Sequence, residues 1–592
     1  NQYTKKGFEG INDLLTKHFF SGYYGDMEIS LAGGRYRPLS LVTFAIEYEF
    51  FGENPHINHF INVLLFALTG ILIYLILLSI LGKYKFREWW FSIPFIATLL
   101  FILHPIHTEV VANIKGRDEI LSLIGALFSL WLLWKYVETK KSRNLYLAFI
   151  TFFLALMSKE NAATFILIIP LTIYFFSTKK LKDYLKIFIP LVLATAAFFW
   201  IRYSIVGGIG GNHPTELMDN PFLNASFIEK YATIFYTFAI YLKLLIFPHP
   251  LTWDYYPYHI ELVGAGNIIT ILSFIFFMAI GVYAILTFKK KSIWTYCILF
   301  FLISFSIVSN LVFSIGAFMA ERFMYIPSLA FCIIIAYVLV ERASKIFKDK
   351  KTNKKAILVF LSIVFLLFAI KTISRNTVWK DDFTLYTHDV NTSKNSAKSN
   401  NIAGQHYGYK ANQTKNQIER DVNFRKSISL LRKSIEIHPK YMDALFYLGN
   451  VYYDYNKNMD STFYYYFKIL EIDSAEKHVF ENTQKIINSC QDIDFKIKIY
   501  SKLFGYNKGD YNVNYSLGSL FGEHKSNLDT SIFFMKNAIE IDPKKADAYK
   551  FLGTVYYLKN EFKNAVEIFE KAIELDSNDE RMKGYLDAAK QR

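Results

Sequence analysis

The sequence is poor in cysteine, proline and charge. Its 592 residues include 3 Cys and 14 Pro, and charged residues make up 20%. Cys297, Cys332 and Cys490 are far apart, so neither a disulfide framework nor a cysteine-based metal site is predicted. Hydrophobic residues make up 53%, and a soluble protein of this composition would have to hide the excess in a very large core.

The hydrophobic residues fall in long blocks between about residues 58 and 373, and from about 380 onward the chain is polar. This shift predicts a lipid-facing part followed by a water-facing part. The formal net charge of +15 would suit a nucleic-acid partner, but most of the surplus in the apolar half lies in short loops between the blocks. Charge in such loops orients a membrane protein, so no nucleic-acid partner is predicted.

The apolar blocks predict membrane-spanning helices, since a helix needs about 20 apolar residues to cross a bilayer core. The candidate spans are 58–81, 89–103, 119–138, 144–157, 162–178, 184–205, 267–288, 292–313, 325–342 and 355–373. A crossing at 227–247 would break the alternation of loop charge, so we expect an interfacial or re-entrant helix there. The segment 39–51 is expected to lie along the membrane surface, because Glu47 and Glu49 interrupt it.

Loop charges predict the orientation. Lys and Arg cluster at 83–87, 140–143, 179–182, 289–291 and 342–355, and these loops are expected to be cytoplasmic. The other loops, residues 1–57 and everything after 373 are expected on the opposite side. The predicted domains are a first outer loop with an interfacial helix and a truncated N-terminus (1–57), a transmembrane domain (58–373), a linker (374–398) and a repeat domain (399–592).

Repeats are visible after residue 400. The segment KYMDALFYLGNVYYDY at 440–455 is echoed by KKADAYKFLGTVYYLK at 544–559. Gly518 and Gly553 are 35 residues apart, and Gly449 and Gly518 are twice about that distance apart. A period of about 34 residues with Gly in the first helix and Pro at the end is typical of tetratricopeptide repeats. We therefore predict four or five stacked helix pairs, which offer a surface for a polypeptide partner or serve as a spacer.

Charged side chains gather at the outer ends of the predicted spans. They are Arg35, Arg37, Glu109, Arg117, Asp118, Lys159, Glu160, Asp219, Asp254, Glu321 and Arg322. Ionisable groups at membrane depth are costly and therefore usually functional. Arg and Lys can neutralise phosphate, and a carboxylate can act as a general base, so the set suits a negatively charged lipid headgroup and a hydroxyl that must lose a proton. The alternative is that these charges only hold helices together.

Two histidines of this region have a spacing that could suit a metal ion. His104 and His107 stand at i and i+3 in HPIH, but two ligands are too few for a metal site. No metal is therefore predicted, and His107 remains a candidate polar residue of the site.

These segments resemble the transmembrane and tetratricopeptide-repeat-containing O-mannosyltransferases, a branch of the GT-C glycosyltransferases. The segments that carry the resemblance are GRYRPLS at 34–40, PHINHFINVLL at 55–65, HPIHTEVVANIKGRDEILS at 104–122, SKENAATF at 158–165, MDNP at 218–221, FPHPLTWDY at 247–255, MAERFMYIPSLAFC at 319–332 and SRNTVWKDDFTLY at 374–386. The repeats follow at once, as in that family. The resemblance implies an all-α fold, with a GT-C-like polytopic helix bundle followed by a tetratricopeptide-repeat α-solenoid.

The resemblance also implies an activity. It implies inverting transfer of a hexose, with mannose the family's sugar, from a polyprenyl-phosphate donor to a protein hydroxyl on the non-cytoplasmic side. The family's acidic pair, one of which is the expected base, follows a further helix and is expected upstream of Asn1, so no catalytic residue is assigned. Arg35, Arg37, Arg117, Lys159 and Arg322 are implied to hold phosphate. The supporting carboxylates are Glu109, Asp118 and Glu160, and the other site residues are His107, Glu321, Asp219 and Asp254.

Other functions remain open. The chain could be a transferase acting on an envelope lipid or polysaccharide, or a non-catalytic membrane scaffold. A transporter is disfavoured because the charges gather at one membrane face rather than at the midplane. The abundance of Lys, Asn, Tyr and Phe favours a bacterial source, with the repeats in the periplasm; in a eukaryote they would lie in the endoplasmic reticulum lumen. The expected partners are the bilayer, the lipid-linked sugar and a polypeptide, and no further cofactor is predicted.

Overall fold

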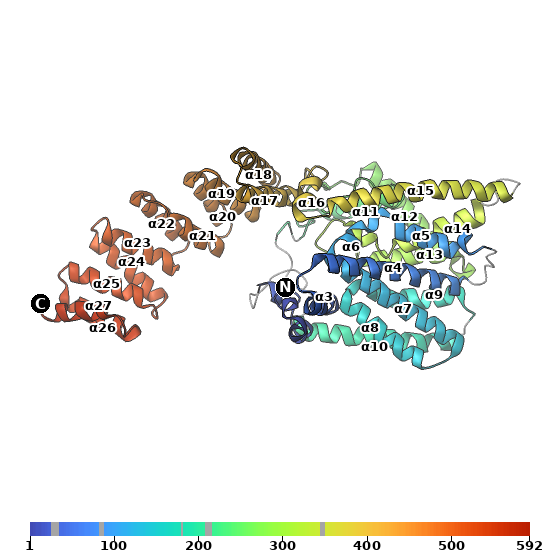
Figure 1. Cartoon of the computed structure of the whole chain (residues 1–592), viewed down its shortest axis with the longest axis horizontal. Helices are drawn as coiled ribbons and strands as arrows, with labels where there is room; N and C mark the ends of the chain where they lie inside the picture. Colours follow the sequence, from blue (N-terminus) through green and yellow to red (C-terminus); the bar gives the residue numbers. More distant parts are fainter. Residues whose placement is uncertain (25–34, 82–87, 179–180, 208–215, 219, 344–349) are drawn as a thin grey trace. The chain divides into compact units, whose positions relative to one another are not determined.

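The computed structural model describes residues 1–592 apart from 25–34, 82–87, 179–180, 208–215, 219 and 344–349 (Figure 1). It divides into two compact units, Asn1–His406 and Tyr407–Arg592. Every regular element in the described ranges is a helix, so the all-α prediction is confirmed. The stretch predicted as a linker, 374–398, contains a helix of its own and lies within the first unit.

The first unit is built from long apolar helices and short connecting ones. Its α-helices are α1 (Ile11–Thr16), α2 (Ser21–Tyr24), α3 (Pro38–Phe51), α4 (Pro55–Ile80), α5 (Ile93–Leu103), α6 (Thr108–Ala112), α7 (Arg117–Thr139), α8 (Arg143–Ser158), α9 (Phe165–Phe176), α10 (Leu181–Val206), α11 (Phe227–Ile246), α12 (Ile268–Thr287), α13 (Ile293–Ser306), α14 (Ser328–Tyr337), α15 (Lys350–Val378) and α16 (Asp382–Asp389). Short 3-10 or π helices are η1 (Thr4–Gly10), η2 (Trp89–Phe91), η3 (Pro105–His107), η4 (Ile114–Gly116), η5 (Glu160–Thr164), η6 (Phe288–Lys290), η7 (Glu321–Met324) and η8 (Val338–Arg342).

Several of these helices are suited to a bilayer. In the described part of the chain, five are long and apolar enough to cross a membrane, namely α4, α12 and the segments 114–139, 184–206 and 352–378. A sixth span is possible if α5 and the bent segment 105–112 are counted together, and shorter apolar helices cover α8, η5 with α9, and α13. The chain is therefore a multi-pass membrane protein.

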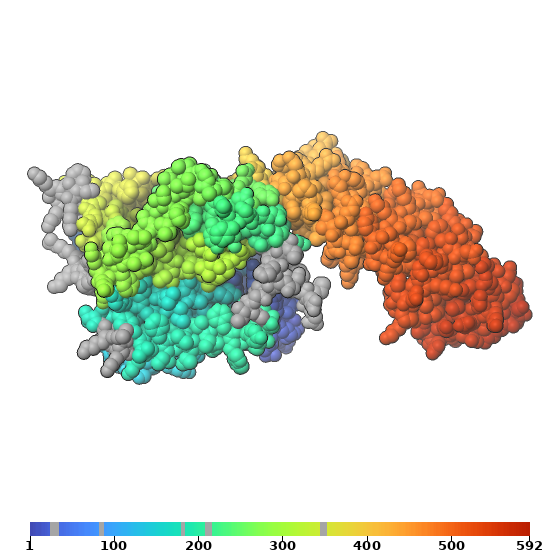
Figure 2. Space-filling model, turned by 180° about the vertical axis from the view of Figure 1, so that it is seen from behind, coloured from blue at the N-terminus to red at the C-terminus, as the bar shows by residue number. Residues whose placement is uncertain are grey.

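The surface of α12 shows the lipid-facing character directly. Its side chains, green in Figure 2, stand on the face of the first unit, where Leu272, Ile275 and Leu286 are 60%, 56% and 75% exposed. A contiguous apolar patch of this kind marks contact with another apolar phase. By contrast, α7 is largely buried, because it packs against α4 and α8.

Helix α11 corresponds to the segment expected to be interfacial or re-entrant. It packs beside α12 and runs in the same direction, because Phe235 and Phe238 contact Phe274 and Phe277 in that order. If α11 and α12 both entered the membrane from one face, the connection between them would have to return to the side where α11 begins. The parallel packing alone does not fix whether α11 crosses, so the absence of a crossing stays a prediction.

The second unit is a stack of helix pairs, as the repeat pattern predicts. Its helices are the remainder of α17 (Ala397–Gln413), followed by α18 (Gln417–Ile437), α19 (Met442–Asn456), α20 (Met459–Leu470), α21 (Lys477–Ile487), α22 (Ile493–Tyr506), α23 (Tyr511–Glu523), α24 (Leu528–Ile541), α25 (Ala546–Leu558), α26 (Phe562–Leu575) and α27 (Glu580–Lys590). The repeating glycines let paired helices approach closely: a Cβ on Gly553 would lie 2.6 Å from the Phe569 ring, and one on Gly518 2.8 Å from Met535. This explains the glycine period physically.

Candidate functional site

The first group of charged residues joins the start of α3 to the starts of α7 and η5. Arg37 immediately precedes Pro38, which begins α3, and its guanidinium donates to Glu160 at 2.8 Å and to Asp118 at 3.0 Å. The Lys159 ammonium lies 2.6 Å from Glu119 and 3.4 Å from Asp118. Three carboxylates thus share two cations, and we call these five residues the acidic cluster.

A second group surrounds the turn η7. The Arg322 guanidinium pairs with Glu109 of α6, and the Arg322 backbone N–H also donates to Glu109 at 3.0 Å. The Arg322 side chain remains 38% exposed, whereas Glu109 is buried. This geometry fixes the Arg322 backbone while leaving part of its guanidinium open to a ligand.

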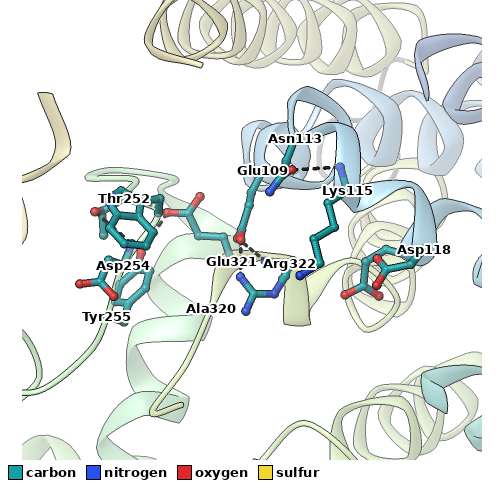
Figure 3. Close-up of polar contacts among 12 residues, drawn as sticks. Glu109, Asn113, Lys115, Asp118, Thr252, Asp254, Tyr255, Ala320, Glu321 and Arg322 are labelled. Carbon is teal, nitrogen blue, oxygen red and sulfur yellow. Dashed lines mark hydrogen bonds and ion pairs between the residues drawn. The ribbon is translucent and has the colours of Figure 1, made fainter. Parts of the chain in front are cut away.

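Two further cations lie close to Arg322. Arg35 and Lys115 are exposed, and both interact electrostatically with Arg322 and with Arg37. Figure 3 shows the Lys115 side chain extending toward Arg322, with Asp118 beyond it. Among the described residues no carboxylate lies within ion-pair distance of Lys115. We call Arg35, Lys115 and Arg322 the cationic cluster, and its positive charges have one closely paired carboxylate, Glu109.

The two clusters lie within electrostatic range of one another, and we call the space between them the shared region. Arg322 interacts electrostatically with Asp118 and Glu119, and Arg35 does so with Glu160. One side of this region is therefore rich in carboxylate and the other in cations. Such a division is able to bind an anionic group at one end and hydrogen-bond hydroxyl groups at the other.

Arg117 stands apart from both clusters. Its side chain is fully buried, and its donors are taken by Glu47, by Asn62 at 2.8 Å, by Thr43 at 3.1 Å and by the Asn58 carbonyl at 2.8 Å. Arg117 thus ties α7 to α3 and α4 and has no donor aimed at the shared region. Glu47, which the sequence pattern treats as an interruption of a surface helix, is buried as the partner of this arginine.

Two other sequence-predicted residues also lie outside the clusters. His107 is buried between Ser328, at 2.9 Å, and the Phe101 carbonyl, at 2.8 Å, so both ring nitrogens have partners. Asp254 is buried and accepts from the Ser396 hydroxyl, and burial raises the pKa of Asp254. Asp219 lies outside the described residues. In the described ranges no three His, Cys, Asp or Glu residues are grouped so as to hold a metal ion.

Glu321 is next to Arg322 but belongs to a different set of contacts. Its carboxyl group accepts from the Thr252 backbone N–H at 2.6 Å and from the Tyr255 hydroxyl at 3.0 Å. Figure 3 shows Thr252, Tyr255 and Glu321 on one side and Glu109 with Arg322 on the other. Burial raises the pKa of Glu321 to about 8.

The repeat unit contains a cavity of its own. It has a volume of about 300 Å³ and is lined by Phe480, Leu503 and Val513 with Glu481 and Asp510 among its polar residues. The lining mixes apolar side chains with polar and charged ones, a combination that suits a side chain of an extended polypeptide.

Comparison with known proteins identifies a repeat in the second unit. The tetratricopeptide repeat family matches residues 546–579. The solved structures that this chain resembles include "Crystal structure of YrrB: a TPR protein with an unusual peptide-binding site". The TM-score is 0.24 at 18% identity, over 35% of this chain and 98% of that one. Another is "Crystal structure of MamA", with a TM-score of 0.21 at 20% identity over 26% of this chain and 91% of that one.

Curated relatives cover much more of the sequence. Protein O-mannosyl-transferase TMTC3 of Mus musculus is 25% identical over 92% of this chain and 57% of its own length. Protein O-mannosyl-transferase F38B6.6 of Caenorhabditis elegans is 28% identical over 65% of this chain and 53% of its own length. Human protein O-mannosyl-transferase TMTC1 is 26% identical over 70% and 49%. The chain thus spans about half the length of these relatives, and over most of its own length it is similar to animal proteins named protein O-mannosyl-transferases.

Proposed function

We propose that this protein transfers a hexose, and specifically mannose, from a polyprenyl-phosphate donor to a hydroxyl group of a protein, with inversion at the sugar carbon. The names of the relatives support glycosyl transfer to protein. The observation that carries the proposal for this chain is the pairing of a cationic cluster with an acidic cluster in one multi-pass membrane unit.

The cationic cluster is the proposed phosphate site. Arg35, Lys115 and Arg322 carry three positive charges at neutral pH, and among the described residues Glu109 is the one carboxylate in close contact with them. A lipid phosphate would balance that excess, and a guanidinium can bind two phosphate oxygens at once. We assign to Lys115 the phosphate contact that the sequence resemblance assigned to Arg117, because the Arg117 donors are all engaged inside the bundle.

The acidic cluster is the proposed sugar site. Arg37 and Lys159 hold Asp118 and Glu160 in place rather than binding phosphate themselves. The carboxylate oxygens left over can accept from sugar hydroxyl groups, which fixes the sugar relative to the phosphate. We assign no catalytic base to a residue of this chain.

The predicted topology places both clusters and the repeats on the non-cytoplasmic side, because the basic loops, such as Lys289–Lys291, belong on the cytoplasmic side. The relatives named above are animal proteins and do not support the predicted bacterial source. In an animal cell the same face would be the lumen of the endoplasmic reticulum. The repeats would then lie where they can present a polypeptide to the site.

The test is donor cleavage by purified protein. Polyprenyl-phosphate [¹⁴C]mannose is supplied with a mixture of secretory-pathway polypeptides, and both released polyprenyl phosphate and labelled protein are measured. We expect wild-type protein to release the lipid, and Lys115→Ala and Arg322→Ala to lower kcat/KM by about a hundredfold each, since each removes a charge-assisted phosphate contact. Lys290→Ala, which removes an exposed cation of η6, is the matched control.

The same assay separates the alternatives. Release of lipid with label in lipid or polysaccharide instead of protein would favour the envelope transferase. If wild-type protein released no lipid from any hexose donor while still binding polypeptide through the repeats, the chain would be a scaffold and the proposal would be abandoned.

A further inference from the structure

The segment 252–258 is fastened to residues 389–397 by several hydrogen bonds. The two backbones pair reciprocally: Tyr258 N–H donates to the Asn395 carbonyl and Ala397 N–H to the Pro257 carbonyl, each at 3.0 Å. The Ser393 hydroxyl contacts the Thr252 hydroxyl at 2.7 Å and donates to the Asp254 carbonyl at 2.8 Å. We call the two segments together the clasp. They hold Ala397, the first residue of α17, in place within the first unit.

A buried ion pair anchors the clasp to α15. Arg375 donates two hydrogen bonds of 2.6 Å to Asp389, and Asp389 also accepts from the Trp253 backbone N–H at 2.8 Å. Arg375 and Asp389 are 3% and 0% exposed as side chains. A bidentate pair with this degree of burial fixes geometry closely, because breaking it would leave a charge without a partner inside the protein.

Glu321 connects the clasp to the cationic cluster. Its side chain holds the Thr252 N–H and the Tyr255 hydroxyl of the clasp, while the next residue in the chain, Arg322, is held by Glu109. The preceding residue is also fixed, since the Ala320 N–H donates to the Tyr241 hydroxyl at 3.0 Å. The backbone at 320–322 is therefore restrained from three sides, and the Glu321 side chain provides the restraint from the clasp.

We propose that Glu321 is a positioning residue that sets the Arg322 guanidinium by tying η7 to the clasp. The inference rests on the proposed function in one respect, namely that Arg322 binds the donor phosphate. The restraint of the Arg322 backbone by Glu321 does not depend on that function and can be measured without any donor.

The charges around Glu321 add a pH dependence to its role. Arg375 and Lys371 face it from α15, Glu109 from α6, Tyr241 from α11 and Tyr255 from the clasp, and Arg322 follows it in the chain. Because burial raises the pKa of Glu321 to about 8, its carboxyl group is mostly neutral at pH 7 and becomes ionised as the pH rises through that value. Ionisation would place a negative charge beside the phosphate site and weaken donor binding there.

The first test is hydrogen exchange on the purified full-length protein, read at the Thr252 and Arg322 amides. Glu321→Ala removes the acceptor for Thr252, and we expect exchange to become about tenfold faster at both amides. Glu321→Gln keeps a carbonyl acceptor and should restore protection to within about threefold of wild type at both. The control is Glu261→Ala, an exposed carboxylate in the same connection. Faster exchange at Thr252 with unchanged protection of Arg322 would show that Glu321 only fastens the clasp, and it would overturn the proposal.

The second test is the dependence of donor KM on pH. Between about pH 6.5 and 9.5, we expect the wild-type KM to rise about fivefold through a midpoint near the pKa of Glu321, with kcat changing less. Glu321→Gln should give a clearly smaller rise than wild type, because glutamine does not ionise; the rise that remains comes from Lys115, whose pKa burial lowers to about 8. Glu321→Ala should raise KM throughout. A Glu321→Gln profile that titrates like wild type would refute the inference. If wild-type protein turned over no donor, the proposed function would fail, while the exchange experiment would still decide whether Glu321 positions Arg322.

Discussion

Arg117 offers a sharp test of which cations hold the bundle together and which face a ligand. Removing its side chain leaves the buried Glu47 without a cation, and the amide oxygen of Asn62 and the carbonyl of Asn58 lose their arginine donor. Breaking one side of a buried pair costs about 3–5 kcal/mol, and a further unsatisfied polar group costs about 1–3 kcal/mol. Arg117→Ala is therefore expected to lose at least about 4 kcal/mol of stability, a large share of the usual 5–15 kcal/mol.

A double substitution shows whether the loss of stability comes from the broken ion pair or from the loss of packing by the Arg117 side chain. If the cost comes from the orphaned carboxylate, Arg117→Met combined with Glu47→Leu should be less destabilising than Arg117→Met alone, since the second change removes the buried charge. The assay is thermal unfolding in one detergent, followed by size-exclusion chromatography with fluorescence detection. The unfolding temperatures of the variants are compared at one fixed heating rate, because unfolding of such proteins is commonly irreversible. Wild-type stability for Arg117→Ala together with a raised donor KM would refute the reasoning and return Arg117 to the phosphate site.

Three further outcomes are expected. In a Cys490→Ala background, Lys415→Cys, an exposed position on the loop before α18, should react with an impermeant thiol reagent only from the non-cytoplasmic side, and labelling from the cytoplasmic side would refute the topology. A chain ending at Gln413 should keep donor cleavage but lose most transfer to protein, and equal transfer would show that the repeats do not present the acceptor. Gly125→Leu should destabilise the bundle by about 1–3 kcal/mol, measured as a lower unfolding temperature, because even a Cβ at Gly125 would lie 2.8 Å from Ala155; unchanged stability would contradict the close packing of α7 on α8.

Periodic features of the fold could be predicted from the sequence because their causes are local. Each apolar block gives a helix, and the glycine period gives the helix pairs, since Gly553 and Gly518 lie directly under large side chains of the neighbouring helix. The shorter apolar helices are different. The segment 292–313 was predicted as one span, but α13 ends at Ser306, and the Asn310 side chain then donates to the Ala317 and Phe318 carbonyls in a non-helical turn. Hydropathy could not predict this end, because the sequence stays apolar beyond Ser306 and the turn that follows is held by hydrogen bonds of one amide side chain.

The assignment of individual charges needed the structure for a related reason. Arg117 and Lys115 are two residues apart, in a stretch where η4 gives way to α7, so the side chains leave the chain in different directions. The Arg117 side chain enters the bundle and pairs with Glu47, which lies 70 residues earlier in the sequence. The Lys115 side chain extends toward Arg322, which lies more than 200 residues later. Side-chain chemistry favours arginine over lysine as a phosphate ligand. Arg117, however, makes five hydrogen bonds inside the protein. Whether Arg117 or Lys115 can bind phosphate therefore depends on which side chain still has free donors after folding. The partners that occupy the Arg117 donors are distant in sequence, so the sequence pattern does not reveal them.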